Sequence, residues 1–206
     1  MLEAIDLECV RGDRTLFRGV SFTLRGGDLL RIAGANGTGK TSLLRMVCGL
    51  LTPAAGQILW NGVRIGELDD EYHADLVYVG HLNAVKDELN AVENVLIAGR
   101  LAGLSPAPQE VTGALRDFGL GGYEHLPCKL LSQGQRRRVA LTRLRLSVPR
   151  SLWVLDEPFT ALDTAGVNLT RSMIEAHLAC GNIALLTTHQ EVDVAATSTH
   201  TIQLDS

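Results

Sequence analysis

The residues with the clearest capacity for chemistry form a glycine-rich segment at positions 34–41, Gly-Ala-Asn-Gly-Thr-Gly-Lys-Thr. Every position fits the pattern GxxxxGK[ST]. Glycines let the backbone fold around a phosphate, so that successive N–H groups and the N-terminus of the next helix point at the anion. A turn that binds nothing would not require Lys-Thr at this offset. The segment therefore predicts phosphate binding, without separating a kinase from a GTPase or a transport ATPase.

Roles within this segment follow from side-chain chemistry. Lys40 is expected to bring a compact positive charge to the β- and γ-phosphates of a nucleotide, and the Thr41 hydroxyl is expected to bind Mg²⁺. The residues expected to contact the phosphates are Gly34, Ala35, Asn36, Gly37, Thr38, Gly39, Lys40, Thr41 and Ser42.

A second candidate for chemistry is a pair of acids, Asp156 and Glu157, that follows the apolar run Leu-Trp-Val-Leu at 152–155. The run predicts a buried strand, and open α/β sheets bind ligands at the carboxyl ends of their strands. Adjacent strand residues point to opposite sides, so the two acids have different roles. We assign Asp156 to Mg²⁺ and Glu157 to polarising the attacking water as general base. Without the phosphate segment, a solvated acidic strand end would be the competing explanation.

The surrounding sequence alternates between expected strands and helices. Asn61-Gly62 predicts a two-residue hairpin turn, because both positions tolerate positive φ. Near-continuous apolar runs at 152–155 and 183–188, with a helix between them, imply parallel strands covered on both faces. Strands are expected at 2–10, 20–24, 28–33, 57–60, 63–65, 76–79, 152–155 and 183–188, and helices at 41–48, 91–101, 109–118, 132–147 and 167–179.

These elements predict one domain, residues 1–206. An α/β core with an antiparallel β part is expected from residues 1–80 and 150–206. The helical character of residues 90–130 predicts a lobe inserted into that core, at about 81–149. The fold class is therefore α/β, with a helical insertion.

Composition excludes several classes of protein. The net charge of −4 gives no footprint for nucleic acid, and the basic run 136–138 with Arg143 and Arg145 is spread around several faces of its expected helix. The apolar runs are broken within a few residues, whereas a membrane-spanning helix needs ~20. Any membrane role must therefore come through a partner. The four cysteines lie far apart, which indicates reduced thiols rather than metal ligands or disulfides.

Together with three further motifs, these segments resemble the ABC ATPase family across nearly the whole chain. Leu-Ser-Gln-Gly-Gln at 131–135 is similar to the LSGGQ signature, Thr-Ala-Leu-Asp at 160–163 to the D-loop, and His189 to the switch histidine. The order of the motifs along the chain is also that of the family. The resemblance implies a P-loop NTPase core of mainly parallel sheet, with an N-terminal antiparallel β part and an inserted α-helical subdomain. ATP and Mg²⁺ are the implied cofactors.

The resemblance also implies that the site is shared between two copies of the chain. Ser132 opens a helix, so its hydroxyl and the nearby N–H groups form an anion-binding end, although a plain helix cap is the simpler explanation of Ser132 alone. In the family this end faces the γ-phosphate held by the other copy, and His189 holds the γ-phosphate. Two copies would enclose two MgATP head to tail. The further contacts with the nucleotide implied by the motifs are Ser132, Gln133, Gly134, Gln135 and Asp163.

Two positions depart from the family pattern. His81 stands where the family has a glutamine that contacts Mg²⁺ and the membrane partner. Its ring can donate or accept a hydrogen bond, so we keep it as a catalytic and metal-binding candidate, and its charge can change near neutral pH. The aromatic residue that normally stacks on adenine is absent, and Arg11 is at the matching place. Its guanidinium can stack on a base, but a solvated arginine at a strand end is an equal alternative.

Within the family, one subgroup is most similar. The motifs Tyr-Val-Gly-His at 78–81, Glu-Leu-Asn-Ala-Val-Glu-Asn at 88–94 and Asp-Glu-Pro-Phe-Thr-Ala-Leu-Asp at 156–163 resemble the ATP-binding subunits of bacterial cytochrome c maturation complexes, also called haem exporters. This implies a dimer held peripherally at the cytoplasmic face of the inner membrane by integral membrane subunits. Its ATP hydrolysis would support haem handling or release of a haem-loaded chaperone, and no direct haem binding is expected.

Two alternatives stay open at this point. One is a soluble ABC ATPase that serves cofactor assembly without a membrane partner. The other is a small-molecule phosphotransferase, against which the signature at 131–135 and His189 argue, because such an enzyme needs an acceptor pocket and a lid instead.

Overall fold

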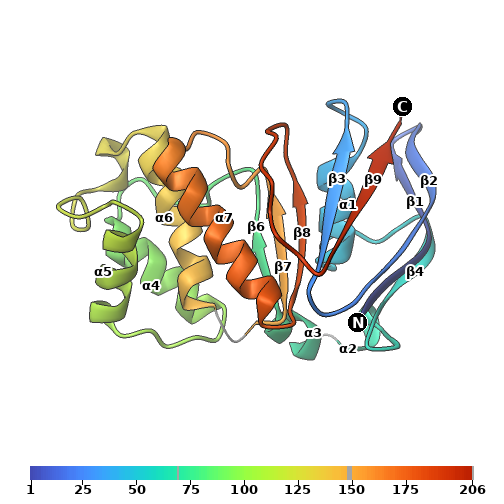
Figure 1. The fold of residues 1–206 in the computed structure, drawn as a ribbon, viewed down its shortest axis with the longest axis horizontal. Coiled ribbons are helices and arrows are strands. Elements are labelled where there is room, and N and C mark those ends of the chain that lie inside the picture. Colours follow the sequence, from blue (N-terminus) through green and yellow to red (C-terminus); the bar gives the residue numbers. More distant parts are fainter. Residues whose placement is uncertain (69, 148–149, 206) are drawn as a thin grey trace.

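A computed structural model describes residues 1–68, 70–147 and 150–205 of the chain. An antiparallel sheet and a group of helices lie at opposite ends of the molecule, with a parallel sheet between them (Figure 1). The strands are β1 Leu2–Arg11, β2 Arg14–Leu24, β3 Asp28–Gly34, β4 Ala55–Trp60, β5 Val63–Arg64, β6 Leu76–Val79, β7 Leu152–Asp156, β8 Ile183–Thr187 and β9 Ser198–Leu204. The helices are α1 Lys40–Val47, α2 Ile65–Leu68, α3 Asp70–Asp75, α4 Ala91–Leu101, α5 Pro108–Asp117, the 3₁₀ turn η1 Cys128–Leu130, α6 Gln133–Leu146 and α7 Thr164–Ala179.

The parallel sheet has the order β6-β7-β8-β3-β9, and all of its pairings are parallel. Every residue of β7 and β8 is buried. Alternate side chains of β7 enter two cores: Val154 packs with α1, whereas Trp153 packs with α7. Both faces are therefore covered, and the α/β class with buried parallel strands is confirmed.

One strand of this sheet was missed. β9 pairs along β3 at the edge of the sheet, and its residues up to Thr201 are exposed. An edge strand with one side open to solvent does not need the apolar run that identified β7 and β8. Only Ile202 and Leu204 contact the core.

The antiparallel sheet has the order β2-β1-β4-β5. β4 and β5 join through Asn61 and Gly62, whose φ values of 52° and 85° confirm the hairpin turn. The second strand was predicted too short, because β2 already begins at Arg14 and shifts its register against β1. β5 ends at Arg64, where the predicted strand ran to 65, and Ile65 begins the short helix α2. Neither α2 nor α3 was predicted.

The helices α4, α5 and α6 pack around a small core of their own. Its members include Val95 of α4, Leu115 of α5 and Val139 of α6. Asn90 and Glu93 form a capping box at the start of α4, and Ser132 and Gln135 form one at the start of α6. These boxes fix where two of the three helices begin. The domain boundaries at residues 80 and 150 stay a prediction.

No helix within the described residues is long and apolar enough to cross a membrane. The cysteines Cys9, Cys48 and Cys128 are buried, Cys180 is exposed, and all four are free thiols.

His177 makes the stability of the fold depend on pH. Its ring stacks on Trp153 with centroids 4.0 Å apart, and Nε2 lies 3.1 Å from the carbonyl oxygen of Ile183. Burial lowers the pKa of His177 to about 4, against the opposing effect of that carbonyl. The unfolded chain, with an ordinary histidine pKa of 6.5, therefore binds the proton first as the pH falls.

We expect the contribution of the neutral ring to be complete above pH ~6.5 and to be lost towards pH ~4. Lowering the pH from 7.5 to 5.0 should therefore reduce the free energy of unfolding by about 2 kcal/mol. Urea unfolding at both values checks this, with His177→Phe as the control that keeps a stacking ring but cannot bind a proton. Equal pH dependence in the two proteins would contradict the assignment.

Candidate active site

A cavity of about 630 Å³ opens where β3, β6, β7 and β8 end. These strands are parallel, so the loops that follow them meet at one edge of the sheet. The cavity brings together the phosphate segment, the two acids and both predicted site histidines. Its lining residues are Leu16, Asn36, Gly37, Gly39, Lys40, Thr41, Ser42, His81, Asp156, Glu157, Thr160, His189 and Gln190.

The phosphate segment forms a tight loop between β3 and α1 that only glycine permits at its ends. Gly34 and Gly39 have φ values of 143° and 104°. A Cβ atom on Gly34 would lie 2.5 Å from the carbonyl oxygen of Leu204. No side chain caps the start of α1, since Gly39 is the N-cap residue. The first N–H groups of the helix are therefore available to an anion.

The Lys40 ammonium group lies over this loop. Its Nζ donates to the carbonyl oxygens of Gly34 at 2.7 Å and Ala35 at 3.1 Å. The charge is thus held beside the loop's N–H groups, at the wall of the cavity. A phosphate in this loop would meet both the backbone donors and the cation.

Two of the three residues predicted to bind Mg²⁺, Thr41 and Asp156, are in direct contact. The Thr41 hydroxyl, at the start of α1, donates to Asp156 Oδ2 at 2.8 Å. Thr187 of β8 donates to the other oxygen, Oδ1, at 2.7 Å. Asp156 is only 2% exposed, so these two hydroxyls keep a buried carboxylate hydrogen-bonded. His81 lines the same cavity from the segment after β6.

Glu157 lies one residue past the end of β7 and turns its side chain towards His189. Its φ of 52° takes the chain out of the strand direction. Oε2 accepts a hydrogen bond from the backbone N–H of His189 at 3.3 Å, and the His189 ring Nε2 lies 3.5 Å from Oε1. Oε1 is buried and, among the described residues, has no hydrogen bond. The Glu157 carboxylate thus lies at the cavity wall, beside the ring of His189.

The signature residues lie on the helical lobe, and none of these described residues lines the cavity. Ser132 Oγ accepts from Gln135 N at 3.2 Å, and Gln135 Oε1 accepts from Ser132 N at 2.8 Å. A Cβ on Gly134 would lie 2.6 Å from the Ala161 carbonyl oxygen, so the signature packs against the D-loop of its own chain. The residues concerned are Ser132, Gln133, Gly134 and Gln135.

Asp163 is placed at a helix start rather than at the cavity. Its Oδ1 accepts from Gly166 N at 2.8 Å, which caps α7, and from Arg138 Nη2 at 2.6 Å. The hydrogen bonds from Gly166 and then Arg138 lower the pKa of this carboxyl below its ordinary value. Its charge therefore holds the D-loop to the helix that carries the signature.

Arg11 does not line the cavity. It is exposed at the end of β1, opposite Arg14 in the hairpin. Leu16 lines the cavity instead, and a Cβ on Gly39 would lie 3.2 Å from the Leu16 Cβ. Sequence reasoning missed Leu16 because it did not recognise the first half of β2. It also missed Gln190, the residue after His189, and it assigned no site role to Thr160, the first residue of the predicted D-loop.

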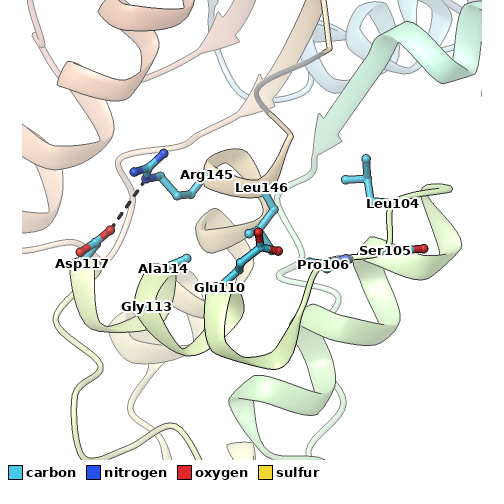
Figure 2. Close-up of a pocket in the computed structure, with 9 residues that line it drawn as sticks. All are labelled: Leu104, Ser105, Pro106, Glu110, Gly113, Ala114, Asp117, Arg145 and Leu146. Carbon is cyan, nitrogen blue, oxygen red and sulfur yellow. Dashed lines mark ion pairs between the residues drawn. The ribbon is translucent and has the colours of Figure 1, made fainter.

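A second cavity, of about 520 Å³, lies on the helical lobe (Figure 2). It is formed by α5, the end of α6 and the segment before α5, and Arg145 faces Asp117 across it at 3.8 Å. Two of its side chains are carboxylates, which disfavour a phosphate, and it holds no predicted site residue. The lining residues are Leu104, Ser105, Pro106, Glu110, Gly113, Ala114, Asp117, Arg145 and Leu146. The nucleotide is therefore assigned to the first cavity.

Comparison with known proteins agrees with this geometry. The family model for ABC transporters matches residues 17–160. The cytochrome c biogenesis ATP-binding export protein CcmA of Nitrosospira multiformis is 51% identical over 203 residues, covering 98% of both chains. CcmA of Dechloromonas aromatica is 52% identical, over 99% of this chain and 100% of that one.

Solved structures show the same fold. A putative ABC transporter ATP-binding protein from Pyrococcus furiosus is 25% identical with a TM-score of 0.82, over 98% of this chain and 96% of that one. A dimeric, post-hydrolysis structure of the ATP-binding cassette MJ0796 with ADP and Pi is 19% identical with a TM-score of 0.79, over 92% and 88%.

The cavity, the order of the motifs and the fold thus agree with the sequence similarity to CcmA proteins, which covers almost the whole chain. The chain is an ATP-binding, ATP-hydrolysing protein that belongs to the ABC transporter family and, within it, to the family of the cytochrome c biogenesis ATP-binding export proteins.

Proposed function

We propose that this chain is the ATP-hydrolysing subunit of an ABC complex for c-type cytochrome biogenesis. ATP hydrolysis is coupled there to haem handling or to release of a haem-loaded chaperone. The observation that carries the proposal is the shared cavity of Lys40, Asp156, Glu157 and His189, in a chain that is about half identical to CcmA proteins over almost its whole length.

Mg²⁺ is proposed to accompany ATP. The hydroxyl of Thr41 and the carboxylate of Asp156 lie 2.8 Å apart and are oxygen donors of the kind this ion binds. His81 is the third candidate, on the wall formed by the segment after β6. The ion supplies neutralisation of the phosphate charge.

In the proposed hydrolysis, the protein contributes positioning and charge rather than a covalent intermediate. The phosphate loop and Lys40 orient the triphosphate. Glu157 polarises the attacking water with its carboxylate, and His189, which already contacts that carboxylate, holds the γ-phosphate. Leu16 supplies an apolar surface beside the loop, and Arg11 stays a proposal for contact with the base from a more distant position.

The second half of each site is proposed to come from another copy of the chain. The start of α6, with Ser132, Gln133, Gly134 and Gln135, is an exposed helix N-terminus that can bind an anion but does not line its own chain's cavity. Asp163 is proposed to join it through the D-loop that packs on Gly134. Two copies placed head to tail would then enclose two nucleotides.

The complex is proposed to lie peripherally on the cytoplasmic face of the inner membrane, held by integral membrane subunits. Support comes from the relatives, which are named export proteins. Neither nucleic acid nor haem is proposed as a ligand of this chain.

Glu157→Gln tests the base assignment. The amide keeps the shape of the side chain but cannot take a proton, so ATP turnover should fall about 100-fold or more. The affinity of the chain for ATP should stay within about twofold of wild type, because the contacts that bind ATP before the reaction are unchanged. Phosphate release and titration with a fluorescent ATP analogue measure the two effects. Glu67→Gln, on exposed α2, is the matched control, and wild-type turnover by Glu157→Gln would refute the role.

Ser132→Arg tests the shared site. A bulky side chain at the start of α6 should block approach of the second copy and reduce turnover about 100-fold, since a donor to the phosphates is lost. ATP binding to the single chain should be unchanged. Ser132→Asp, which keeps the helix cap but repels phosphate, should act in the same way, and Ser105→Arg on the same lobe should have no effect. Normal turnover in both Ser132 variants would disprove a signature contributed by the partner.

Co-purification tests the biological assignment. The tagged full chain, solubilised from its native membranes in mild detergent, should bring down integral membrane subunits in stoichiometric amount, identified by mass spectrometry. Recovery with soluble partners alone would contradict the membrane complex and favour a soluble ABC ATPase for cofactor assembly.

A further inference from the structure

Arg137 makes an unusual set of contacts below the active site. It lies in the second turn of α6 and is only 3% exposed. Its Nη2 donates to the carbonyl oxygens of Asp156 at 2.9 Å and Glu157 at 2.7 Å. Its Nη1 donates to the carbonyl oxygen of Gly80 at 2.9 Å and to Asn83 Oδ1 at 3.2 Å. One guanidinium therefore joins the end of β7 to the segment that carries His81.

The peptide groups that it holds are those on either side of Glu157. On the opposite side, the Glu157 N–H donates to the Thr187 carbonyl oxygen at 3.2 Å and to its hydroxyl at 3.0 Å. A positive φ in a residue other than glycine costs on the order of 1 kcal/mol and persists only where surrounding contacts impose it. Arg137 and Thr187 provide those contacts, so they set the direction of the Glu157 side chain.

Burial of this cation is costly, which argues for a role beyond packing. Loss of hydration lowers the pKa of the Arg137 guanidinium, while Asp156 and Glu157 act in the opposite direction. Its Nε is buried and has no hydrogen bond among the described residues. A buried charge often contributes no more stability than an apolar side chain of similar size. What an apolar side chain cannot do is bridge two segments through a planar fork.

The position of Arg137 on α6 connects this fork to the signature. Ser132 caps the same helix five residues earlier, and Gly134 packs on the D-loop carbonyl of Ala161. A helix moves as a rigid rod over such a short distance. Any displacement of α6 when its N-terminus engages a phosphate must therefore act on the Glu157 turn and on the segment before His81.

We propose that Arg137 is a positioning residue for ATP hydrolysis, which couples the signature helix to the orientation of Glu157 and of the His81 segment. This inference rests on the proposed function, since it takes Glu157 as the general base. It requires the loss of Arg137 to slow the chemical step without weakening the binding of ATP.

The neighbouring arginines show which control is appropriate. Arg136 pairs with Asp87, and Arg138 pairs with Asp163 of the D-loop. Arg143 is another shielded arginine of α6, with its pKa lowered by burial, but its side chain donates to Ala140 of its own helix. Arg143→Gln therefore removes a shielded cation whose hydrogen bond does not reach the active site.

The test compares Arg137→Gln and Arg143→Gln in the full chain, in the complex that co-purifies with it. For Arg137→Gln, kcat should fall about 10- to 100-fold, while KM for ATP and the affinity for a fluorescent ATP analogue stay within about twofold. For Arg143→Gln, kcat should stay within about twofold of wild type even where the melting temperature falls equally.

Chemical rescue separates positioning from a general loss of structure. Guanidinium ion, added below denaturing concentrations, should restore part of the kcat of Arg137→Ala, because it can fill the space left by the Arg137 guanidinium and make the same hydrogen bonds. Methylammonium, a cation without the planar fork, should not. Neither ion should raise the kcat of Glu157→Gln, because the Arg137 guanidinium is still present in that variant.

The outcomes separate this inference from the proposed function. A wild-type kcat in Arg137→Gln, or an equal fall of kcat in Arg143→Gln, would overturn the role of Arg137. The assignment of Glu157 as general base would still hold if Glu157→Gln is inactive. Full activity of Glu157→Gln would overturn the base assignment itself. If Arg137→Gln does not fold, Arg137→Lys replaces it: one ammonium cannot reach both segments, so unchanged kcat in that variant would equally refute the inference.

Discussion

The carboxylate of Asp156 is the group on which the rest of the active site depends. It is buried at the end of β7, and its two oxygens accept hydrogen bonds from Thr41 of α1 and Thr187 of β8. An unpaired charge at this depth would cost several kcal/mol, so the three elements have to meet at this point. Once they do, the phosphate loop is fixed on one side of Asp156 and Glu157 on the other. The need to hydrogen-bond the buried Asp156 carboxylate therefore determines how the elements of the site are arranged.

Two unlike surfaces of the chain are proposed to contact nucleotide. One is the cavity at the sheet edge, and the other is the N-terminus of α6, which lies outside that cavity. Within the chain the second surface is nonetheless tied to the first. The D-loop carbonyl of Ala161 lies against Gly134, Arg138 pairs with Asp163, and Arg137 reaches the backbone of Glu157. A second copy that engages the signature would therefore act on the hydrolytic groups through contacts already present in one chain.

Local sequence predicted the buried part of the fold and failed mainly at its edges. β7 and β8 were found because strands buried on both faces need uninterrupted apolar residues. The start of α6 was found because Ser132 and Gln135 satisfy each other's backbone groups. β9, by contrast, is exposed over most of its length, and the first half of β2 has no regular alternation. Leu16, which lines the cavity, was missed for that reason, whereas the predicted Arg11 does not line it.

The sequence by itself determined the chemistry: glycines with Lys40 and Thr41 for a triphosphate, two acids after a strand, and the family to which these motifs belong. Such motifs are short, and their backbone requirements are local, so spacing along the chain is sufficient to recognise them. Only the tertiary structure decided which of them share a cavity. Strands that are far apart in the sequence end at the same edge of the parallel sheet, and this brings the motifs together. The tertiary structure alone showed that Arg137 lies beneath Glu157, since no local pattern distinguishes this buried arginine of α6 from its half-buried neighbours.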